Sequence, residues 1–527
     1  MHEYVTRVSA AARAAVSRKE WATVHACARE ILQRDDRSAE GFFLSGLVMK
    51  AQNLADEASA AFSRALELDP ARYDAAIELA SQYSAARRNG DAAALLTKYE
   101  TRLMKSPHYL NFAGNVYLEI GMQDKAFPLF ERANELQPGI PVIENNLATC
   151  YMFLGRIEEA KAIYRSLLQG DPTHQRNHLT YARLDKATDR THIVQMKEVL
   201  DSTNLPPDRN IFMYYALGKE LEDLEAWDEA FEYFKMAGDA VTSVANYDID
   251  TDLRLIDTII DVCNADWLHD SVSRASPATG GKIPIFIVGL PRTGTTLTDR
   301  ILASHSQVQS VGETQFMQMV LRQQSGIDSE EKMTPEMIEA AANLDIDVIG
   351  QGYIDMLAYR LGVEPMFVDK LPFNILYLGF IAKAFPEAKI IYMNRNPMDS
   401  CFAMYKQVFT WAYKFSYTLD GLGRFYIAFD RLLHHWKKTL GDRLIELEYE
   451  TLVTDQENET RRLLERLGLE FEAACLEFHR NESATATASS IQVREKVHTR
   501  SVNRWKNYAR QLEPLRARLE NAGIAVE

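Results

Sequence analysis

The residues best suited to chemistry lie in a glycine- and threonine-rich run, IFIVGLPRTGTTLTDRIL, at residues 285–302. Its apolar start predicts a buried strand and its end predicts a helix, with a tight turn between them. Gly289 and Gly294 allow the backbone N–H groups of that turn to point into one concavity. Thr295 and Thr296 add hydroxyl groups at the start of the helix, whose positive end favours an anion. The run therefore predicts an anion-binding loop.

The loop departs from the nucleotide-binding P-loop at the residue that serves ATP chemistry. A P-loop reads GxxxxGK[ST], with its lysine on the β- and γ-phosphates and its hydroxyl on Mg²⁺. The spacing is kept in GLPRTGTT, but Thr295 stands in place of the lysine, and Arg292 is the only cation in the loop. ATP hydrolysis and kinase chemistry through Mg²⁺ are therefore disfavoured.

Four apolar, β-rich runs predict the strands that would position this loop. The runs are IPIFIVGL (283–290), MFVDK (366–370), AKIIYMNR (388–395) and RLIELEY (443–449), and each precedes a helical pattern. Strand–helix alternation predicts an α/β domain, P-loop-like, with a central, doubly wound parallel sheet. Ligands of such sheets bind at the carboxyl ends of the strands, where Arg292, Lys370 and Arg395 would emerge. Three converging cations predict a ligand with several anionic groups.

The first half of the chain is repetitive. Pro70 and Pro138 close similar segments two 34-residue periods apart, and Pro172 closes another segment one period later. Small and aromatic residues recur in register within these periods, among them Gly46 and Phe62, Gly114 and Phe130, and Gly218 and Phe234. We expect each glycine to let two helices approach closely while the aromatic ring fills the space between them.

Over residues 5–245 this pattern resembles arrays of the tetratricopeptide (TPR) repeat. The resemblance implies an all-α, right-handed superhelix whose concave groove docks a protein or peptide. A rigid spacer and a dimerisation arm are the alternatives, so a homodimer is left open. A serine-, glycine- and proline-rich stretch at 271–284 predicts a linker. We therefore expect a TPR array with a capping helix at 1–262, a linker at 263–282 and an α/β domain at 283–527.

Composition narrows the class of protein. The net charge of −15 over 527 residues disfavours nucleic-acid binding through a basic surface. Five scattered cysteines without a CxxC pair predict free thiols in a reducing compartment, not disulfides or a zinc site. The N-terminus carries no apolar core of a signal peptide, and no apolar run reaches about 18 residues. These features predict a cytoplasmic protein that binds neither nucleic acid nor membrane.

Several motifs of the second half occur together in the order found in one enzyme family. The run IFIVGLPRTGTTLTDRILASHSQVQSVGE resembles the 5′-phosphosulfate loop of sulfotransferases that use 3′-phosphoadenosine 5′-phosphosulfate (PAPS). Residues 283–510 are most similar to the tyrosylprotein sulfotransferase branch and its bacterial relatives with TPR repeats. The resemblance implies the sulfotransferase fold and transfer of the sulfuryl group of PAPS, a co-substrate, to an acceptor hydroxyl or amine. The reaction that the resemblance implies requires no metal. Tyrosine in a protein or peptide, a glycan and a small molecule all remain open as acceptors.

The resemblance also implies roles for individual residues. Residues of PRTGTT would hold the 5′-phosphosulfate: Arg292, Thr293, Gly294, Thr295 and Thr296. In VGET, Glu313 would be the general base, and in VDKLPFN, Lys370 would face the transferring sulfate, with Arg292 also stabilising its charge. In NRNPMDS, Arg395 would bind the 3′-phosphate, and in ELEYETL, Tyr449 would approach the nucleotide.

The C-terminal segment SSIQVREKVHTRSVNRW (489–505) resembles the loop that closes on the 3′-phosphate, with Ser489, Arg494 and Arg504 as its ligands. One departure concerns the 3′-phosphate site. The family has a serine eight residues after the phosphate arginine, where this chain has Ala403, and Ser400 one helical turn earlier could substitute.

Alternatives remain for both the base and the overall function. His305 competes with Glu313 for the base, although a histidine at the end of a helix more often caps or packs. Tyr449 could serve core packing alone. The function could instead be that of a TPR scaffold with a non-catalytic nucleotide-binding domain, which Ala403 would favour, or that of a Mg²⁺-dependent nucleotide kinase.

Overall fold

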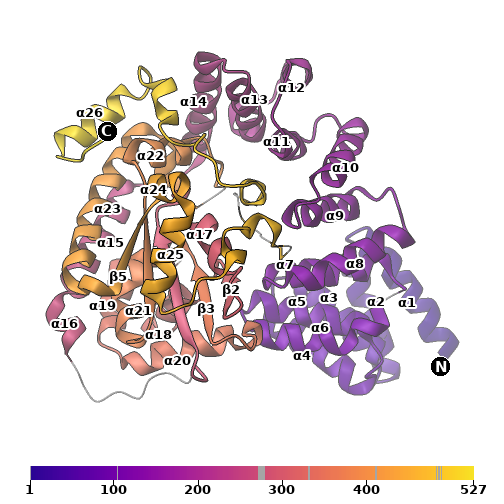
Figure 1. The fold of residues 1–527 in the computed structure, drawn as a ribbon. Helices are drawn as coiled ribbons and strands as arrows, with labels where there is room; N and C mark the ends of the chain where they lie inside the picture. Colours follow the sequence, from indigo (N-terminus) through magenta and orange to yellow (C-terminus); the bar gives the residue numbers. More distant parts are fainter. Residues whose placement is uncertain are drawn as a thin grey trace. The chain divides into compact units, whose positions relative to one another are not determined.

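A computed structural model describes residues 2–103, 105–270, 279–329, 333–409, 412–481, 483–484, 487 and 490–527, with side chains from Tyr4 onward. The chain divides into two compact units, Met1–Cys150 and Tyr151–Glu527. Figure 1 shows the ribbon of both units. All five cysteines are free thiols. Within the described ranges, no helix combines the length and the apolar character that a membrane span needs.

The first unit consists of antiparallel helices. They are α1 (His2–Ser17), α2 (Trp21–Arg34), α3 (Ala39–Ala51), α4 (Ala55–Leu68), α5 (Tyr73–Ala85), α6 (Asn89–Leu103), α7 (Pro107–Glu119), α8 (Gln123–Leu136) and the start of α9 (Pro141–Phe153). A Cβ atom added to Gly46 would lie 2.6 Å from the ring of Phe62, and one added to Gly114 would lie 2.7 Å from Phe130. The predicted pairing of glycine with an aromatic ring is therefore confirmed in two repeats.

The second unit begins with further helices of the same kind. They are α10 (Ile157–Gly170), α11 (Gln175–Leu184), α12 (Thr191–Thr203), α13 (Ile211–Asp223), α14 (Trp227–Val244), α15 (Ile249–Val262) and α16 (Ala265–His269). In the α13–α14 pair, a Cβ atom on Gly218 would lie 2.6 Å from Phe234, which repeats the geometry of the first unit. The segment predicted as a linker, 263–282, contains the short helix α16, and its residues 271–278 lie outside the described part of the chain.

A five-stranded parallel sheet organises the rest of the second unit. Its strands are β1 (Ile283–Gly289), β2 (Val308–Gly312), β3 (Met366–Lys370), β4 (Lys389–Asn394) and β5 (Leu444–Glu448). They lie in the order β2-β3-β1-β4-β5, and every neighbouring pair is parallel. The predicted α/β domain with a central parallel sheet is confirmed. Because β1 is the middle strand, the loop that follows it lies between the ends of β3 and β4.

Helices cover both faces of this sheet. They are α17 (Thr295–Leu302), α18 (Phe316–Ser325), α19 (Pro335–Ala342), α20 (Ile346–Leu357), α21 (Leu378–Ala384), α22 (Pro397–Tyr405), α23 (Leu419–Leu440), α24 (Tyr449–Thr454), α25 (Gln456–Leu467) and α26 (Glu513–Asn521). Short 3₁₀ turns include η3 (Pro372–Tyr377), η8 (Gln492–Arg494) and η9 (Arg504–Tyr508). Three helices, α18, α19 and α20, fill the connection from β2 to β3 and were not predicted from the sequence.

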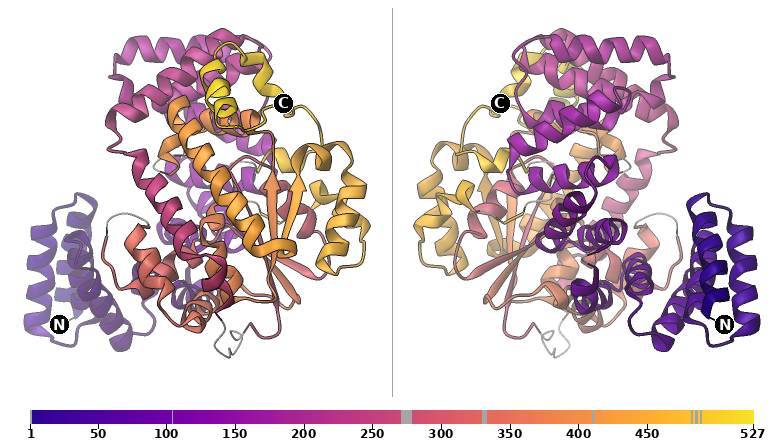
Figure 2. Two further views of the ribbon diagram at one scale, coloured as in Figure 1. Left: turned by 90° about the vertical axis from the view of Figure 1, so that its left-hand side faces the viewer. Right: turned by 90° about the vertical axis from the view of Figure 1, so that its right-hand side faces the viewer.

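Alternation along β1 explains why both faces are covered. Ile285 and Ile287 pack into a core with α17 and α25, whereas Phe286 and Val288 pack into a core with α15, α20 and α23. Successive side chains of a strand point to opposite faces, so an apolar run such as IFIV needs helices on each side. The two groups of helices lie on opposite sides of the sheet in the turned views (Figure 2).

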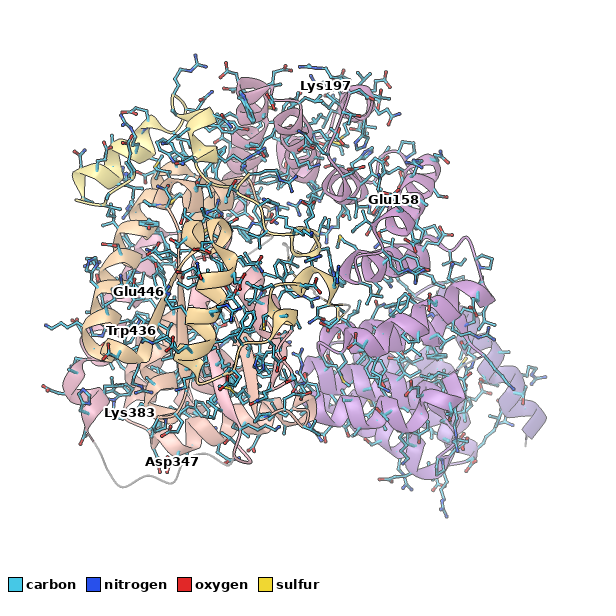
Figure 3. The ribbon with its side chains drawn as sticks, viewed as in Figure 1. Glu158, Lys197, Asp347, Lys383, Trp436 and Glu446 are labelled. Atoms are coloured by element: carbon cyan, nitrogen blue, oxygen red, sulfur yellow. The ribbon has the colours of Figure 1, made fainter. Side chains whose placement is uncertain are left out.

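One buried tryptophan fastens α23 to the segment that follows β3. The indole Nε1 of Trp436, labelled in Figure 3, donates a hydrogen bond of 2.9 Å to the carbonyl oxygen of Ile375 in η3. The side chain is fully buried, and a buried indole N–H needs such a partner. The contact fixes η3, and with it the path of the chain just after Lys370.

Candidate active site

The loop between β1 and α17 has the conformation that its glycines predicted. Arg292 and Gly294 both adopt positive φ angles, of 69° and 98°. Gly294 is the N-cap of α17, and no side chain caps that helix. The first N–H groups of α17 therefore stay available for an anion. Thr293 is buried and donates its hydroxyl proton to the carbonyl oxygen of Leu290 at 2.7 Å, which fastens the turn internally.

Two residues from other strand ends pack against this loop. A Cβ atom on Gly294 would lie only 2.6 Å from Cδ2 of Tyr449, so the ring of Tyr449 leaves room for glycine alone. The guanidinium of Arg395 lies 4.6 Å from the centre of the same ring. Nη1 of Arg395 donates to the carbonyl oxygen of Arg292 at 2.7 Å, and Nη2 donates to that of Ser501 at 2.6 Å. The predicted residues after β1, β4 and β5 are thus brought together.

A carboxylate and an ammonium group meet where β2 and β3 end. Gly312 pairs with Asp369 in the parallel register, so the next residues, Glu313 and Lys370, are neighbours. Nζ of Lys370 forms an ion pair with Oε1 of Glu313. Lys370 is fully buried, whereas the side chain of Glu313 is 40% exposed. A buried ammonium group needs a carboxylate partner, and Glu313 supplies it while still facing solvent.

A second buried carboxyl group supports this pair from behind. Asp369 is fully buried and accepts hydrogen bonds from the hydroxyls of Thr314 and Tyr353 and, at 3.3 Å, from the amide of Asn374. Burial raises its pKa to about 6. The network fixes Thr314, the residue after Glu313. Sequence reasoning missed it, although an aspartate inside an otherwise apolar strand is a signal that could have found it.

The competing base, His305, is held in the interior. It is 2% exposed; its Nε2 donates to the carbonyl oxygen of Glu470 at 2.9 Å, and its Nδ1 accepts from the backbone N–H of Gln307 at 3.1 Å. Both ring nitrogens are therefore engaged in packing contacts at the end of α17. This geometry favours the interpretation that His305 packs at the end of the helix and does not act as a base. Glu313 is left as the candidate base.

The C-terminal segment is tied to α22 through Asp399. Its carboxylate accepts the backbone N–H groups of Asn503 at 2.6 Å and Trp505 at 2.9 Å. Between them lies Arg504, whose Nε donates to Oε1 of Glu222 on α13 at 3.3 Å. Sequence reasoning singled out Arg504 but missed both Asp399 and Glu222. The sequence around Asp399 gives no signal of its role, because the N–H groups that it binds lie more than a hundred residues later in the chain.

A cavity of about 860 Å³, called here the main cavity, connects most of these residues. The predicted residues that line it are Arg292, Gly294, Thr295, Thr296, Glu313, Arg395, Tyr449 and Arg504. Lys370 and Thr293 lie behind this lining. Residues of α11 and α13, in the helical part of the second unit, line it as well.

Three other predicted ligands are placed differently. Ser400 is buried and does not line the main cavity, whereas Ala403 does. The hydroxyl of Ser400 is only 3.5 Å from the carbonyl oxygen of Arg395, so it faces its own backbone. Arg494 donates to the carbonyl oxygens of Phe153 and Ser483 and lies outside the lining. Ser489 lies outside the described residues.

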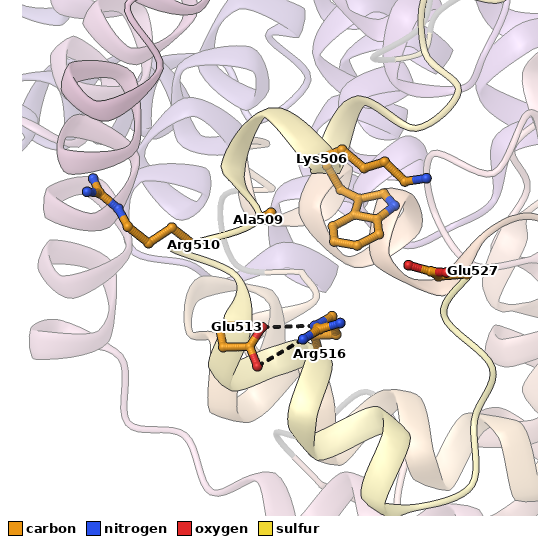
Figure 4. A pocket seen from close by; sticks show the side chains of 7 residues that line it. Lys506, Ala509, Arg510, Glu513, Arg516 and Glu527 are labelled. Carbon is orange, nitrogen blue, oxygen red and sulfur yellow. Dashed lines mark hydrogen bonds and ion pairs between the residues drawn. The ribbon is translucent and has the colours of Figure 1, made fainter.

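A second hollow, of about 600 Å³, lies at the C-terminus (Figure 4). Its lining comes from Trp505, Lys506, Ala509, Arg510, Glu513, Arg516 and Glu527, and Glu513 pairs with Arg516 at 2.8 Å. None of the predicted site residues lines this hollow, which leaves the main cavity as the candidate site.

Comparisons with known proteins agree with this architecture. Residues 284–473 match a family described as "Sulfotransferase family", and residues 121–184 match one described as "Tetratricopeptide repeat". An uncharacterized protein of Aquifex aeolicus (strain VF5) is 30% identical over 78% of this chain and 54% of its own length. A putative protein-tyrosine sulfotransferase of Caenorhabditis briggsae is 25% identical over 42% of this chain and 80% of its own length.

Among solved structures, this chain is similar to the sulfotransferase domain of the Synechococcus PCC 7002 olefin synthase, at 17% identity and with a TM-score of 0.33. The similarity covers 46% of this chain and 97% of that domain. The chain spans only about half the length of its Aquifex relative. The family resemblance expected from the motifs is confirmed by the matches in sequence. The chain thus joins a segment that matches the tetratricopeptide repeat to a segment that matches the sulfotransferase family.

Proposed function

We propose that the protein transfers the sulfuryl group of PAPS to an acceptor hydroxyl, with tyrosine in a protein or peptide as the first candidate acceptor. The single observation that carries this proposal is the Glu313–Lys370 pair at the edge of the cavity that the anion-binding loop lines. Two relatives named as protein-tyrosine sulfotransferases, one of them putative, match 42% of this chain and favour this reaction and acceptor.

The residues of the loop suit PAPS as the co-substrate. The uncapped N-terminus of α17 and the positive φ angles before it offer backbone N–H groups to a 5′-phosphosulfate. Arg292 and Arg395 add charge on the same side of the main cavity, and Tyr449 presents a ring beside them. Nε of Arg395 has no hydrogen-bond partner among the described residues, so it remains available for an anionic oxygen such as that of the 3′-phosphate.

PAPS would supply an activated sulfuryl group; the protein's own residues would do the rest. Glu313 would accept the proton of the acceptor hydroxyl as that oxygen forms its bond to sulfur. Arg292 and the N-terminus of α17 would stabilise the charge left on the phosphate oxygen when its bond to sulfur breaks. Lys370, bound to Glu313 and buried behind it, would hold the carboxylate in place.

The test combines an acceptor screen with binding measurements. Isotope-labelled PAPS is incubated with tyrosine peptides, sugars and phenols, and adenosine 3′,5′-bisphosphate is titrated calorimetrically into the same protein. We expect transfer to at least one acceptor class and measurable heat. Absence of heat for the bisphosphate would refute the proposed donor.

A substitution of the base separates binding from chemistry. Glu313→Gln should lose about 100-fold or more in turnover while the bisphosphate affinity stays unchanged, since general-base catalysis contributes about that factor. Glu225→Gln, an exposed carboxylate elsewhere on the cavity lining, is the matched control and should retain turnover. Undiminished turnover in Glu313→Gln would show that another group is the base.

Ala403 supports a second candidate, a TPR scaffold whose nucleotide-binding domain does not turn over. It lines the main cavity where the family has a serine, so one contact to the 3′-phosphate would be missing. Heat on addition of the bisphosphate without transfer to any acceptor would favour the scaffold. Tighter binding of ATP with Mg²⁺ than of the bisphosphate would favour a kinase. Whether the protein is a sulfotransferase or a scaffold, the repeats of the first unit would dock a protein or peptide partner.

A further inference from the structure

The main cavity has a wall that the sulfotransferase match does not include. Helices α11 and α13 contribute Arg183, Lys219 and Glu222 to its lining. All three residues precede the segment that matches the sulfotransferase family, which begins at residue 284. Arg183 lies within the segment that matches the tetratricopeptide repeat. Side chains of the repeats therefore face the same space as the anion-binding loop, inside one compact unit of the chain.

Three other cations of the cavity lining, one on α13 and two from elsewhere in the fold, have a carboxylate partner. Lys219 pairs with Asp223 at 2.6 Å, and Lys406 pairs with Glu222, also at 2.6 Å. Arg504 shares Glu222 at 3.3 Å. Each of these three side chains therefore has a carboxylate partner, and Glu222 serves two of them.

Arg183 differs from these cations. It is partly buried in the cavity lining, yet its guanidinium makes no hydrogen bond and no ion pair with any described residue. Burial lowers its pKa to about 10, and the like charge of Arg292 acts in the same direction. The pKa of Arg292 is itself lowered to about 10 by burial and by Arg395. Five arginines line this cavity, Arg183, Arg292, Arg395, Arg500 and Arg504, and the one on α11 has no carboxylate partner among the described residues.

Such an arrangement is unfavourable unless an anion occupies the space between the cations. The positive charge of Arg292 in the loop acts on Arg183 and helps to lower its pKa. Arg183 and Arg292 line the same cavity, so Arg183 lies near the anion-binding loop. Because Arg183 and the loop line the same cavity, Arg183 would meet the end of a bound phosphosulfate that the loop amides do not enclose.

We propose that Arg183 binds the sulfuryl end of the donor, opposite Arg292, so that a residue of the helical repeats completes the donor site. The inference rests on the proposed function, since it takes a phosphosulfate as the anion. A guanidinium presents a planar fork to two oxygens at once, which suits a sulfuryl group in transit between two oxygens. Arg183 would hold the negative charge of that group while Glu313 removes the proton of the acceptor.

The test compares two ligands that differ only at the sulfuryl group. PAPS and adenosine 3′,5′-bisphosphate are titrated calorimetrically, without acceptor, into the wild-type protein, Arg183→Ala and Arg183→Lys. We expect Arg183→Ala to bind PAPS roughly tenfold to 100-fold more weakly, as for the loss of a charge-assisted hydrogen bond, with bisphosphate affinity changed by less than about threefold. Arg183→Lys should recover part of the PAPS affinity because it keeps the charge but not the fork.

Arg176→Ala is the matched control. Arg176 lies on the exposed face of the same helix, so its removal changes the net charge equally without touching the cavity. Unchanged PAPS affinity in Arg183→Ala, or equal weakening of both ligands, would overturn the assignment to the sulfuryl end. Absence of heat for both ligands in the wild-type protein would instead overturn the proposed function, so the two failures are distinguishable.

Discussion

Replacing the buried carboxyl group behind the Glu313–Lys370 pair, Asp369→Asn, should remove a specific pH dependence of stability. Asp369 is fully buried, and its partners are two hydroxyls and one side-chain amide, none of them charged. Burial therefore raises its pKa to about 6 from a usual value of 3.8. A difference of that size corresponds to about 3 kcal/mol between the two protonation states.

The sign follows from proton counting. Between pH 4 and pH 6 the folded protein binds the proton more tightly than the unfolded chain, so the free energy of unfolding falls as the pH rises. The contribution of protonated Asp369 is fully present below its usual pKa and is lost as the pH rises through about 6. Asparagine cannot ionise, so the variant lacks this loss. Oδ1 of Asn374 has no partner among the described residues, and turning that amide would let it accept from the new side chain.

The assay is urea denaturation at several pH values between 4 and 7.5, followed by tryptophan fluorescence. Only Trp21 lies in the first unit, so the signal reports mainly on the second. The unfolding free energy of the variant relative to wild type should rise by about 2.4 kcal/mol over this range, because part of the difference is already lost at pH 4. The exposed Asp355→Asn on α20 is the control and should show no such trend. A difference that does not vary with pH would refute the assignment of the raised pKa to Asp369.

Two further predictions concern the loop and the opposite wall of the cavity. Gly294→Ala should lower the unfolding free energy by about 2 kcal/mol and weaken bisphosphate binding, because the methyl group would meet Tyr449 at 2.6 Å in a left-handed backbone conformation. Gly326→Ala, with a φ of 67° and open space around it, measures the backbone strain alone; equal effects of both variants on bisphosphate binding would contradict the reasoning. Glu222→Gln should cost about 3 kcal/mol at neutral pH, as urea midpoints would show, because it leaves two partly buried cations without their carboxylate. Burial acts to raise the pKa of Glu222, but the two cations outweigh it and lower that pKa. The cost of the substitution should therefore shrink as the pH falls through the acid range. A cost that grows there would contradict this prediction.

The sequence allowed the loop and the strand ends to be predicted because their signals are local. Gly289 and Gly294 mark a turn, and Lys370 and Arg395 each follow an apolar run directly. Parallel pairing then brings residues at equivalent strand ends together, which is why Glu313 and Lys370 could be named separately and still meet. The packing of Gly46 against Phe62 was predictable for the same reason, since both follow from a fixed repeat period.

The parts that could not be predicted depend on tertiary contacts. Asp399 binds backbone N–H groups about a hundred residues later in the chain, and Glu222 binds Arg504 from another part of the fold. No periodicity or motif links such residues. Ser400 shows the opposite error: it precedes Ala403 by one helical turn and was predicted to replace the missing serine, but its side chain faces the backbone whereas Ala403 lines the main cavity.

Guanidinium groups from several elements line the main cavity, into which the loop brings no lysine. A P-loop lysine is a single point charge beside the phosphates, whereas Arg292 and Arg395 follow two neighbouring strands and Arg183 comes from a helical repeat. The pKa values of about 10 for Arg183 and Arg292 lie well above neutrality, so both remain charged and their repulsion is not relieved by losing a proton. An anion between them would relieve it. Donor binding would then favour the arrangement of α11 against the loop, which gives the repeats a physical connection to sulfuryl transfer beyond the docking of a partner.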